Sequence, residues 1–183
     1  MATTANRLIS FREFAQLPEP EGFRYELRCG ETAQIPPAHW KYPDLQEQVR
    51  AMLAAFALPT GRVVTEMPFR ALPEYEYRIS DVAFVSWKRW NVIDADGFLQ
   101  GAPDIVVEIL ALSSMAVEIL DKEKVCLENG CQEFWLVDRE RRQVKVSTPD
   151  GHTMTFGPGK QVPLPLLSGT SAAIDAMFAT ANR

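Results

Sequence analysis

Apolar residues recur along the 183-residue chain with two different periods, and together they predict alternating helices and strands. Spacing near the helical period of about 3.6 residues predicts helices over 11–17, 44–58, 115–129 and 171–181. Alternating or continuous apolar runs predict a hairpin over 23–35 and strands over 62–69, 79–86, 104–110, 133–138, 143–148 and 152–156. This order predicts an α/β domain: one mixed central sheet flanked by helices, with an N-terminal helix plus hairpin and a C-terminal β-meander plus helix.

Local signals set several of these boundaries. Ser10 with Glu13, and Asp44 with Glu47, have the spacing of capping boxes at helix N-termini. Gly130 has the position of the glycine that commonly ends a helix. The run 104–110 is almost continuously apolar, which is typical of a strand covered on both faces. We therefore expect this run to form a central, buried strand.

Composition limits the classes of protein that the chain can represent. The length and the 46% hydrophobic content predict one globular domain over 1–183, and the sequence contains no repeat or linker. Lys plus Arg number 19 and Asp plus Glu 24, so the net charge is −5. This charge argues against indiscriminate binding to nucleic acid or anionic membranes, although it still allows a local basic groove.

The cysteines and histidines carry little of the candidate chemistry. Three cysteines without a C-x-x-C pair, and only two histidines, make a structural zinc site improbable. The thiols are expected to be reduced and mostly buried. The chain has no signal-peptide pattern and no apolar run near the roughly 20 residues of a membrane span. We expect a cytoplasmic protein with no membrane partner.

Two carboxylates interrupt predicted strands. Glu108 lies inside the apolar run 104–110, and Asp81 lies near the start of the run 79–86. A buried carboxylate is costly unless it is ion-paired, hydrogen-bonded or bound to a metal. Glu108 is therefore the most informative residue, with a structural ion pair as the alternative. Asp81 has a stronger alternative, because an aspartate that opens a strand often only caps a turn.

The helix predicted after Glu108 offers a basic partner. Its apolar arc comprises Met115, Ala116, Ile119, Leu120, Cys126 and Leu127. Lys122 lies at the edge of that arc, where its side chain can extend along the core surface towards Glu108. The alternative interpretation is that Lys122 is an ordinary solvated lysine. Glu123 falls inside the arc, which the pattern does not explain.

No phosphate-binding loop, dinucleotide fingerprint, nucleophile elbow or zinc-protease motif is present. Two carboxylates and a lysine are a set suited to magnesium-assisted phosphodiester hydrolysis. Carboxylate oxygens hold the ion, the ion lowers the pKa of a water molecule, and a lysine orients that water or screens the phosphate.

The order and spacing of six segments resemble the Uma-type putative restriction endonuclease family, within the PD-(D/E)XK nuclease superfamily. The matching segments are Tyr25-Glu26-Leu27 with Gly30-Glu31, then 78–85, 97–99, 101–110, Lys122 before Gly130, and 133–138. The resemblance implies a restriction endonuclease-like αβββαβ core.

It also implies a metal-dependent endonuclease with DNA as substrate and Mg²⁺ or Mn²⁺ as cofactor. Asp81 and Glu108 would bind the ion, and the Ile109 carbonyl would complete its shell. Lys122 would activate or position the water, and Glu26 would lie at the edge of the site. Candidate contacts to the phosphate backbone are Arg62, Arg78, Lys88 and Arg89, with a solvated charged surface as the alternative for each. Trp87 and Trp90, beside two of these residues, would pack against nucleotides or, alternatively, fill a local core or interface. Nucleases that cut both strands are often dimers, so we assume a homodimer.

Several positions depart from the pattern of relatives. Residues 111–113 are Ala-Leu-Ser where relatives usually have Ser-Pro-Ser. Ser80 replaces a proline, Glu118 replaces an aspartate, and Cys126 replaces a tyrosine. His39 lies too far upstream to match the histidine that the family has before its first core helix. The first of these departures and the net charge favour an alternative, a catalytically inactive nuclease fold that serves as a binding or oligomerisation module. Retention of Asp81, Glu108 and Lys122 opposes it. A third hypothesis is a metal-dependent hydrolase of another phosphate ester.

Overall fold

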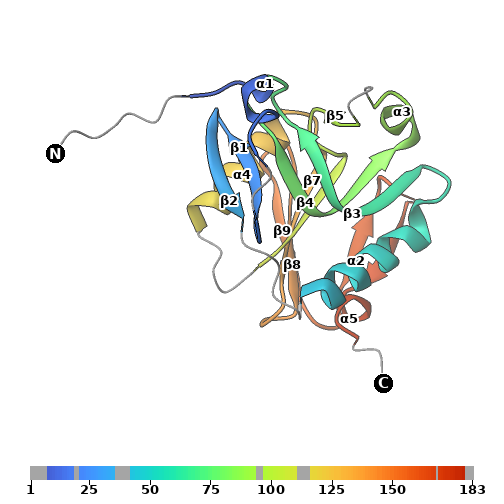
Figure 1. Cartoon of the computed structure of the whole chain (residues 1–183). Coiled ribbons are helices and arrows are strands. Elements are labelled where there is room, and N and C mark those ends of the chain that lie inside the picture. The colour runs from blue at the N-terminus through green and yellow to red at the C-terminus, as the bar shows by residue number, and fades with distance from the viewer. Residues whose placement is uncertain are drawn as a thin grey trace.

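The computed structural model describes residues 8–18, 21–35, 42–93, 97–110, 116–167 and 169–179. Within these ranges, the core is a seven-stranded mixed sheet in the order β5-β3-β4-β6-β7-β8-β9 (Figure 1). The pairs β6–β7 and β3–β5 are parallel, and the other neighbours are antiparallel. His39, residues 94–96 and 111–113, and the end of the chain from residue 180 lie outside the described residues.

The predicted strands of the core are all present. The sheet comprises β3 Gly61–Arg70, β4 Arg78–Ser86, β5 Leu99–Gln100, β6 Ile105–Ile109, β7 Glu133–Asp138, β8 Gln143–Ser147 and β9 Thr153–Phe156. Helix α4, Ala116–Glu128, connects the parallel strands β6 and β7, as a parallel pair requires. Strand β6 lies between β4 and β7 and is buried along most of its length, which confirms the predicted central strand.

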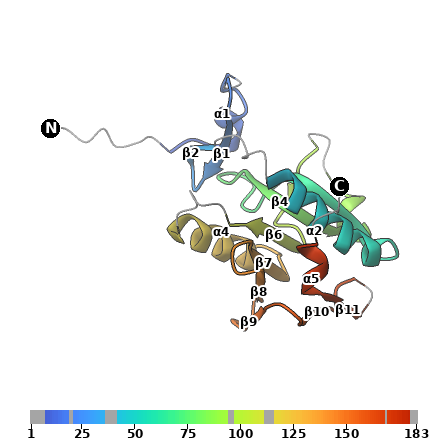
Figure 2. The ribbon, with the colours of Figure 1, turned by 90° about the horizontal axis from the view of Figure 1, so that it is seen from below.

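Each face of the sheet has its own helical layer. Helix α2, Tyr42–Ala57, and the short helix α5, Ile174–Met177, pack on one face, and α4 packs on the other (Figure 2). Alternation along β6 divides its side chains between the faces. Ile105, Val107 and Ile109 belong to the core beneath α2, whereas Val106 belongs to the core beneath α4. Glu108 therefore has the register of the α4 face.

An N-terminal unit extends the α4 side of the domain. Strands β1, Arg24–Arg28, and β2, Glu31–Ile35, form the predicted hairpin, and helix α1, Phe11–Phe14, lies beside it (Figure 1). Ser10 and Glu13 form the expected capping box of α1. The hairpin is fixed beside β4 through the pairing of Leu27 with Tyr77, the residue before this strand. Strand β4 thus pairs with β6 along one part of its edge and contacts β1 along another.

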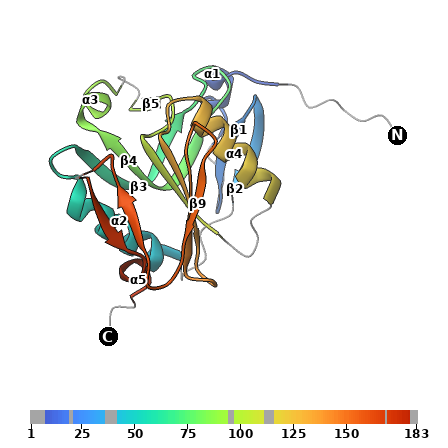
Figure 3. The same cartoon turned by 180° about the vertical axis from the view of Figure 1, so that it is seen from behind.

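Three predicted helices differ from the structure. Helix α1 ends at Phe14, whereas the prediction extended to residue 17. Helix α2 begins at Tyr42, upstream of the predicted Asp44 cap, because Pro43 suits a first helical turn that needs no N–H donor. The predicted helix over 171–181 is confirmed only over Ile174–Met177, which form α5, because Thr170–Ala173 form β11, which pairs with β10, Gln161–Leu164 (Figure 3). Short elements β5 and α3, Trp87–Trp90, were not predicted.

Helix α4 is rotated relative to the predicted apolar arc. Lys122, Val125 and Cys126 are buried, whereas Leu120 is exposed. Glu123, which the arc did not explain, forms an ion pair with Lys145 on β8, with 3.0 Å between Glu123 Oε2 and Lys145 Nζ. Gly130 has a positive φ of 108° just after the helix, so it takes the predicted helix-ending conformation.

Cys126 and Cys131 are buried free thiols and Cys29 is exposed. In the described part of the chain, no helix is long and apolar enough to cross a membrane.

Candidate active site at the β4–β6 fork

Asp81 and Glu108 lie on neighbouring strands at the point where β4 leaves β6. The antiparallel pairing of Val82 with Val107 makes Asp81 and Glu108 the next opposed positions. The Asp81 Oδ2 atom accepts a 2.6 Å hydrogen bond from the Ile109 N–H. Asp81 is the fourth residue of β4, so the interpretation that it caps a turn at the start of a strand is wrong.

Lys122 reaches this fork from α4. Its Nζ atom lies 2.7 Å from Glu108 Oε1 and donates a 2.7 Å hydrogen bond to the Ile79 carbonyl oxygen. Its side chain is only 9% exposed, so the interpretation as a solvated lysine is wrong. Glu108 Oε1 is buried and receives no well-aligned hydrogen bond from a described residue, although the Lys122 charge is adjacent.

Glu26 joins the same group from the N-terminal hairpin. Its Oε1 atom accepts a 3.0 Å hydrogen bond from the Ile79 N–H and lies 3.6 Å from Lys122 Nζ. Its Oε2 atom accepts a 3.1 Å hydrogen bond from Arg28. The Glu26 side chain is 4% exposed, so it is buried at the site rather than exposed on the hairpin.

The pKa values of the three carboxylates show that neighbouring charges and hydrogen bonds offset the cost of burial to different extents. Burial raises the pKa of Glu108 to about 8, an effect that Lys122 opposes and that the charge of Asp81 reinforces. Burial also raises the pKa of Asp81, against the Ile109 N–H and Lys122. For Glu26, burial is outweighed by Lys122 and the Ile79 N–H, so the pKa is lowered. Asp81 and Glu108 are thus the under-compensated carboxylates of the site.

Lys122 shows the opposite balance. Burial disfavours its charge, but Glu108 and Glu26 raise the pKa of Lys122 above its usual value. The amine is therefore an ammonium ion that donates hydrogen bonds and cannot accept a proton.

A second ion-pair network lies behind the site and joins β4 to α4. Arg78 donates from Nε to Glu76 at 2.5 Å and from Nη2 to Asp121 at 2.8 Å. Glu76 also accepts a 2.7 Å hydrogen bond from the Cys29 N–H of the hairpin turn. Arg78 is 1% exposed, so the prediction that it contacts phosphates is wrong. The network instead fixes the hairpin and α4 around the fork.

Sequence reasoning missed three contributors to the site. Gln46 on α2 donates a 2.7 Å hydrogen bond to the Asp81 carbonyl oxygen, Ile79 contributes only its main chain, and Glu76 supports Arg78. Gln46 and Glu76 are buried polar residues, yet neither interrupts an apolar strand of the pattern. No periodic signal could have found the main-chain groups of Ile79.

The other predicted phosphate-binding residues lie around α3. The Arg62 guanidinium stands 4.7 Å from the Trp90 ring centroid, and Arg89 lies 3.5 Å from an Asp104 carboxylate oxygen. Lys88 is exposed and Trp87 is partly exposed. Their contact with nucleic acid stays a prediction.

In the part of the chain that the structure describes, no three His, Cys, Asp or Glu side chains form a cluster able to hold a metal ion by themselves. Mg²⁺ commonly uses only one or two protein carboxylates and completes its shell with water and substrate phosphate. The Asp81–Glu108 pair is a donor set of that kind.

The chain is similar to known proteins in both sequence and fold. The family model Uma2, described as putative restriction endonuclease, matches residues 11–175. A solved structure of a putative nuclease of the DUF820 group from Anabaena variabilis has 25% sequence identity and a TM-score of 0.78. The match covers 93% of this chain and 97% of that one. No curated protein matches the sequence. Because the family model spans most of the chain, this protein belongs to the Uma2 putative restriction endonuclease family and has its restriction endonuclease-like fold.

Proposed function

We propose that the protein is a metal-dependent endonuclease that hydrolyses DNA phosphodiester bonds at the β4–β6 fork. The observation that carries the proposal is the convergence of three side chains from three elements: Asp81 of β4, Glu108 of β6 and Lys122 of α4, with Lys122 Nζ 2.7 Å from Glu108. The family and its nuclease neighbour support the reaction class.

Asp81 and Glu108 are the proposed ligands of Mg²⁺ or Mn²⁺. Both carboxylates are partly buried and have raised pKa values, and Glu108 Oε1 lacks a well-aligned donor, so a divalent cation would add to the charge compensation that Lys122 provides. The Ile109 carbonyl stays a proposed third ligand, and the hydrogen bond from the Ile109 N–H to Asp81 holds this residue beside the pair. When bound, the ion supplies Lewis acidity and lowers the pKa of a water molecule.

Lys122 is proposed to orient the attacking water and to neutralise charge on the phosphate. As an ammonium ion it is a hydrogen-bond donor, so it is excluded as the general base while it stays charged. The Ile79 carbonyl and Glu26 hold its Nζ atom beside Glu108. The proposal includes a homodimer, because cleavage of both strands uses two such sites.

The test is cleavage of supercoiled plasmid by the purified protein with Mg²⁺ or Mn²⁺. Wild type is expected to nick the plasmid, and Glu108→Ala and Lys122→Ala variants, checked for folding by circular dichroism, are expected to lose the activity. The exposed-residue variant Lys124→Ala on the same helix serves as the control and should cleave like wild type.

Equal cleavage by all four proteins would indicate a contaminating nuclease and contradict the proposed site. No cleavage with any ion would favour the inactive binding or oligomerisation module. Hydrolysis of small phosphate esters without plasmid cleavage would favour the third hypothesis, a different phosphate-ester hydrolase.

Glu26→Gln is expected to lower kcat for cleavage roughly 10-fold to 100-fold while changing KM little, because removing the charge loosens Lys122 without altering a group that contacts DNA. Steady-state cleavage of a labelled duplex over a range of substrate concentrations measures the two parameters. Glu31→Gln, an exposed change on the partner strand of the same hairpin, should leave both unchanged. An equal loss in both variants would assign the effect to the hairpin fold rather than to Glu26.

A further inference from the structure

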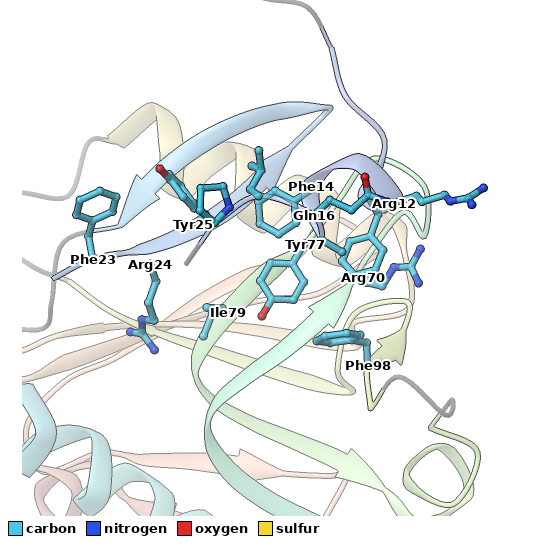
Figure 4. A pocket seen from close by; sticks show the side chains of 14 residues that line it. Arg12, Phe14, Gln16, Phe23, Arg24, Tyr25, Arg70, Tyr77, Ile79 and Phe98 are labelled. Carbon is cyan, nitrogen blue, oxygen red and sulfur yellow. The ribbon is translucent and has the colours of Figure 1, made fainter. Parts of the chain in front are cut away.

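An elongated cavity of about 900 Å³ lies between α1 and the strands beside the fork (Figure 4). Its walls come from α1 and the segment after it, from the start of β1, and from residues of β3, β4 and the β3–β4 and α3–β5 connections. Its volume falls in the range of about 300–1,000 Å³ that is typical of small-ligand sites.

The lining of this cavity differs sharply from the rest of the chain. It contains three arginines and no carboxylate, although the whole chain has a net charge of −5. Six of its residues are aromatic: Phe11, Phe14, Phe23, Tyr25, Tyr77 and Phe98. Flat rings with positive charges around them favour a ligand that combines an aromatic ring with negative charge.

The rings stand in two groups. Tyr77 packs against Phe14 and Phe98 at centroid distances of 5.3 Å and 5.4 Å, and Phe23 packs edge-on against Tyr25 at 5.6 Å. Figure 4 shows the second group at one side of the cavity, with Arg24 near it.

Arg12 and Arg70 lie at the opposite end of the cavity in the same view. The Arg70 guanidinium lies 3.8 Å from the Phe11 ring centroid, and its buried Nε atom has no hydrogen-bond partner among the described residues. An unused N–H donor therefore lies in the lining at the end away from Arg24.

The end that contains Arg24 adjoins the candidate active site through Ile79. Ile79 lines the cavity, and its main chain holds both Glu26 and Lys122. Arg24 forms an ion pair of 2.8 Å with Glu66, which lies opposite Asp81 between the paired positions of β3 and β4. A strand whose phosphate lay at Asp81 would thus have the cavity beside it.

We propose that this cavity binds an unpaired nucleotide of the nucleic-acid substrate, with its base against Tyr25 and Tyr77 and its phosphates near the arginines. A base inside a duplex presents its faces to its neighbours, so only an unpaired base can stack on these rings. The inference rests on the proposed nuclease function for the identity of the strand. It implies that the protein prefers single-stranded or frayed DNA to a blunt duplex.

The test measures binding rather than cleavage, and EDTA removes divalent ions. Fluorescence anisotropy is recorded with a fluorescein-labelled 12-nucleotide deoxyadenosine strand, alone and annealed to its complement. The single strand is expected to bind at least 10-fold more tightly. Tyr25→Ala should weaken its binding roughly fivefold to 150-fold, as expected for the loss of one stacked base.

Two controls separate stacking from a loss of folding. Tyr25→Phe keeps the ring and should bind within twofold of wild type, as should Tyr75→Ala, an exposed tyrosine outside the cavity. Arg24→Gln should reduce the dependence of affinity on salt, whereas Arg142→Gln, which also breaks an exposed ion pair, should not. If Tyr25→Ala fails to fold, the arginine pair decides the question.

Equal affinity for single strand and duplex, or wild-type binding by both Tyr25→Ala and Arg24→Gln, would overturn the inference. Displacement of the strand by deoxyadenosine monophosphate at the same nucleotide concentration would also overturn it, since the site would then take a free nucleotide. Binding that depends on Tyr25 in a protein that cuts no plasmid would leave the cavity assignment intact and refute the proposed nuclease. Plasmid cleavage by wild type, together with wild-type binding by the cavity variants, would support the proposed nuclease and refute the cavity assignment.

Discussion

Replacing Lys122 with methionine is expected to lower the free energy of unfolding by about 3 to 5 kcal/mol, the usual cost of breaking a buried ion pair. Methionine fills similar space but leaves the carboxylates of Glu108 and Glu26 and the Ile79 carbonyl without their shared cation. Glu26 in particular has a lowered pKa, so it stays charged at neutral pH in a buried position. Urea unfolding at pH 7 in EDTA, followed by circular dichroism, measures the change.

Two further variants isolate the ion pair. Lys124→Met changes an exposed lysine on the same helix and should alter stability by no more than about 0.5 kcal/mol. The double variant Lys122→Met with Glu108→Gln should recover part of the loss, with a coupling energy of about 0.5 to 3 kcal/mol. A loss below about 1 kcal/mol in Lys122→Met would mean that the lysine does not neutralise the buried carboxylates, and the account of the site would fail.

The core of the fold could be predicted because its signals are local and periodic. A continuous apolar run predicted β6, and a single charge inside that run identified Glu108. The cost of burying that charge then required a partner, and Lys122 is within 2.7 Å of it. The first step needed only the sequence and the energetics of burial, whereas the choice of Lys122 over a solvated lysine also rested on the family resemblance.

The parts that could not be predicted depend on contacts distant in sequence. Strand β10 has alternating burial, but Pro163 argues against a strand in the interior of a sheet. It is tolerated here because, among the described strands, β10 pairs with β11 alone in a two-stranded ribbon. That pairing also makes the start of the predicted last helix a strand.

The same limit applies to the site. The Ile79 main chain joins Glu26 to Lys122, yet every residue has such groups, so no residue type marks them. Arg78 looked like a surface cation until the fold placed it against Glu76 and Asp121.

Asp81→Asn is expected to remove most of the stabilisation that Mn²⁺ gives to the folded protein. An ion that binds only the folded state at 100 times its dissociation constant adds about 2.7 kcal/mol, which is about 5 to 11 °C in Tm for a chain of this size. Asparagine keeps an acceptor for the Ile109 N–H but removes the charge that would hold the cation. Differential scanning calorimetry with and without Mn²⁺ measures the shift, and Asp44→Asn, at an exposed position on α2, should keep the wild-type shift. An equal Mn²⁺ shift in wild type and Asp81→Asn would place the ion elsewhere and would remove Asp81 from the metal site, whatever the plasmid assay showed.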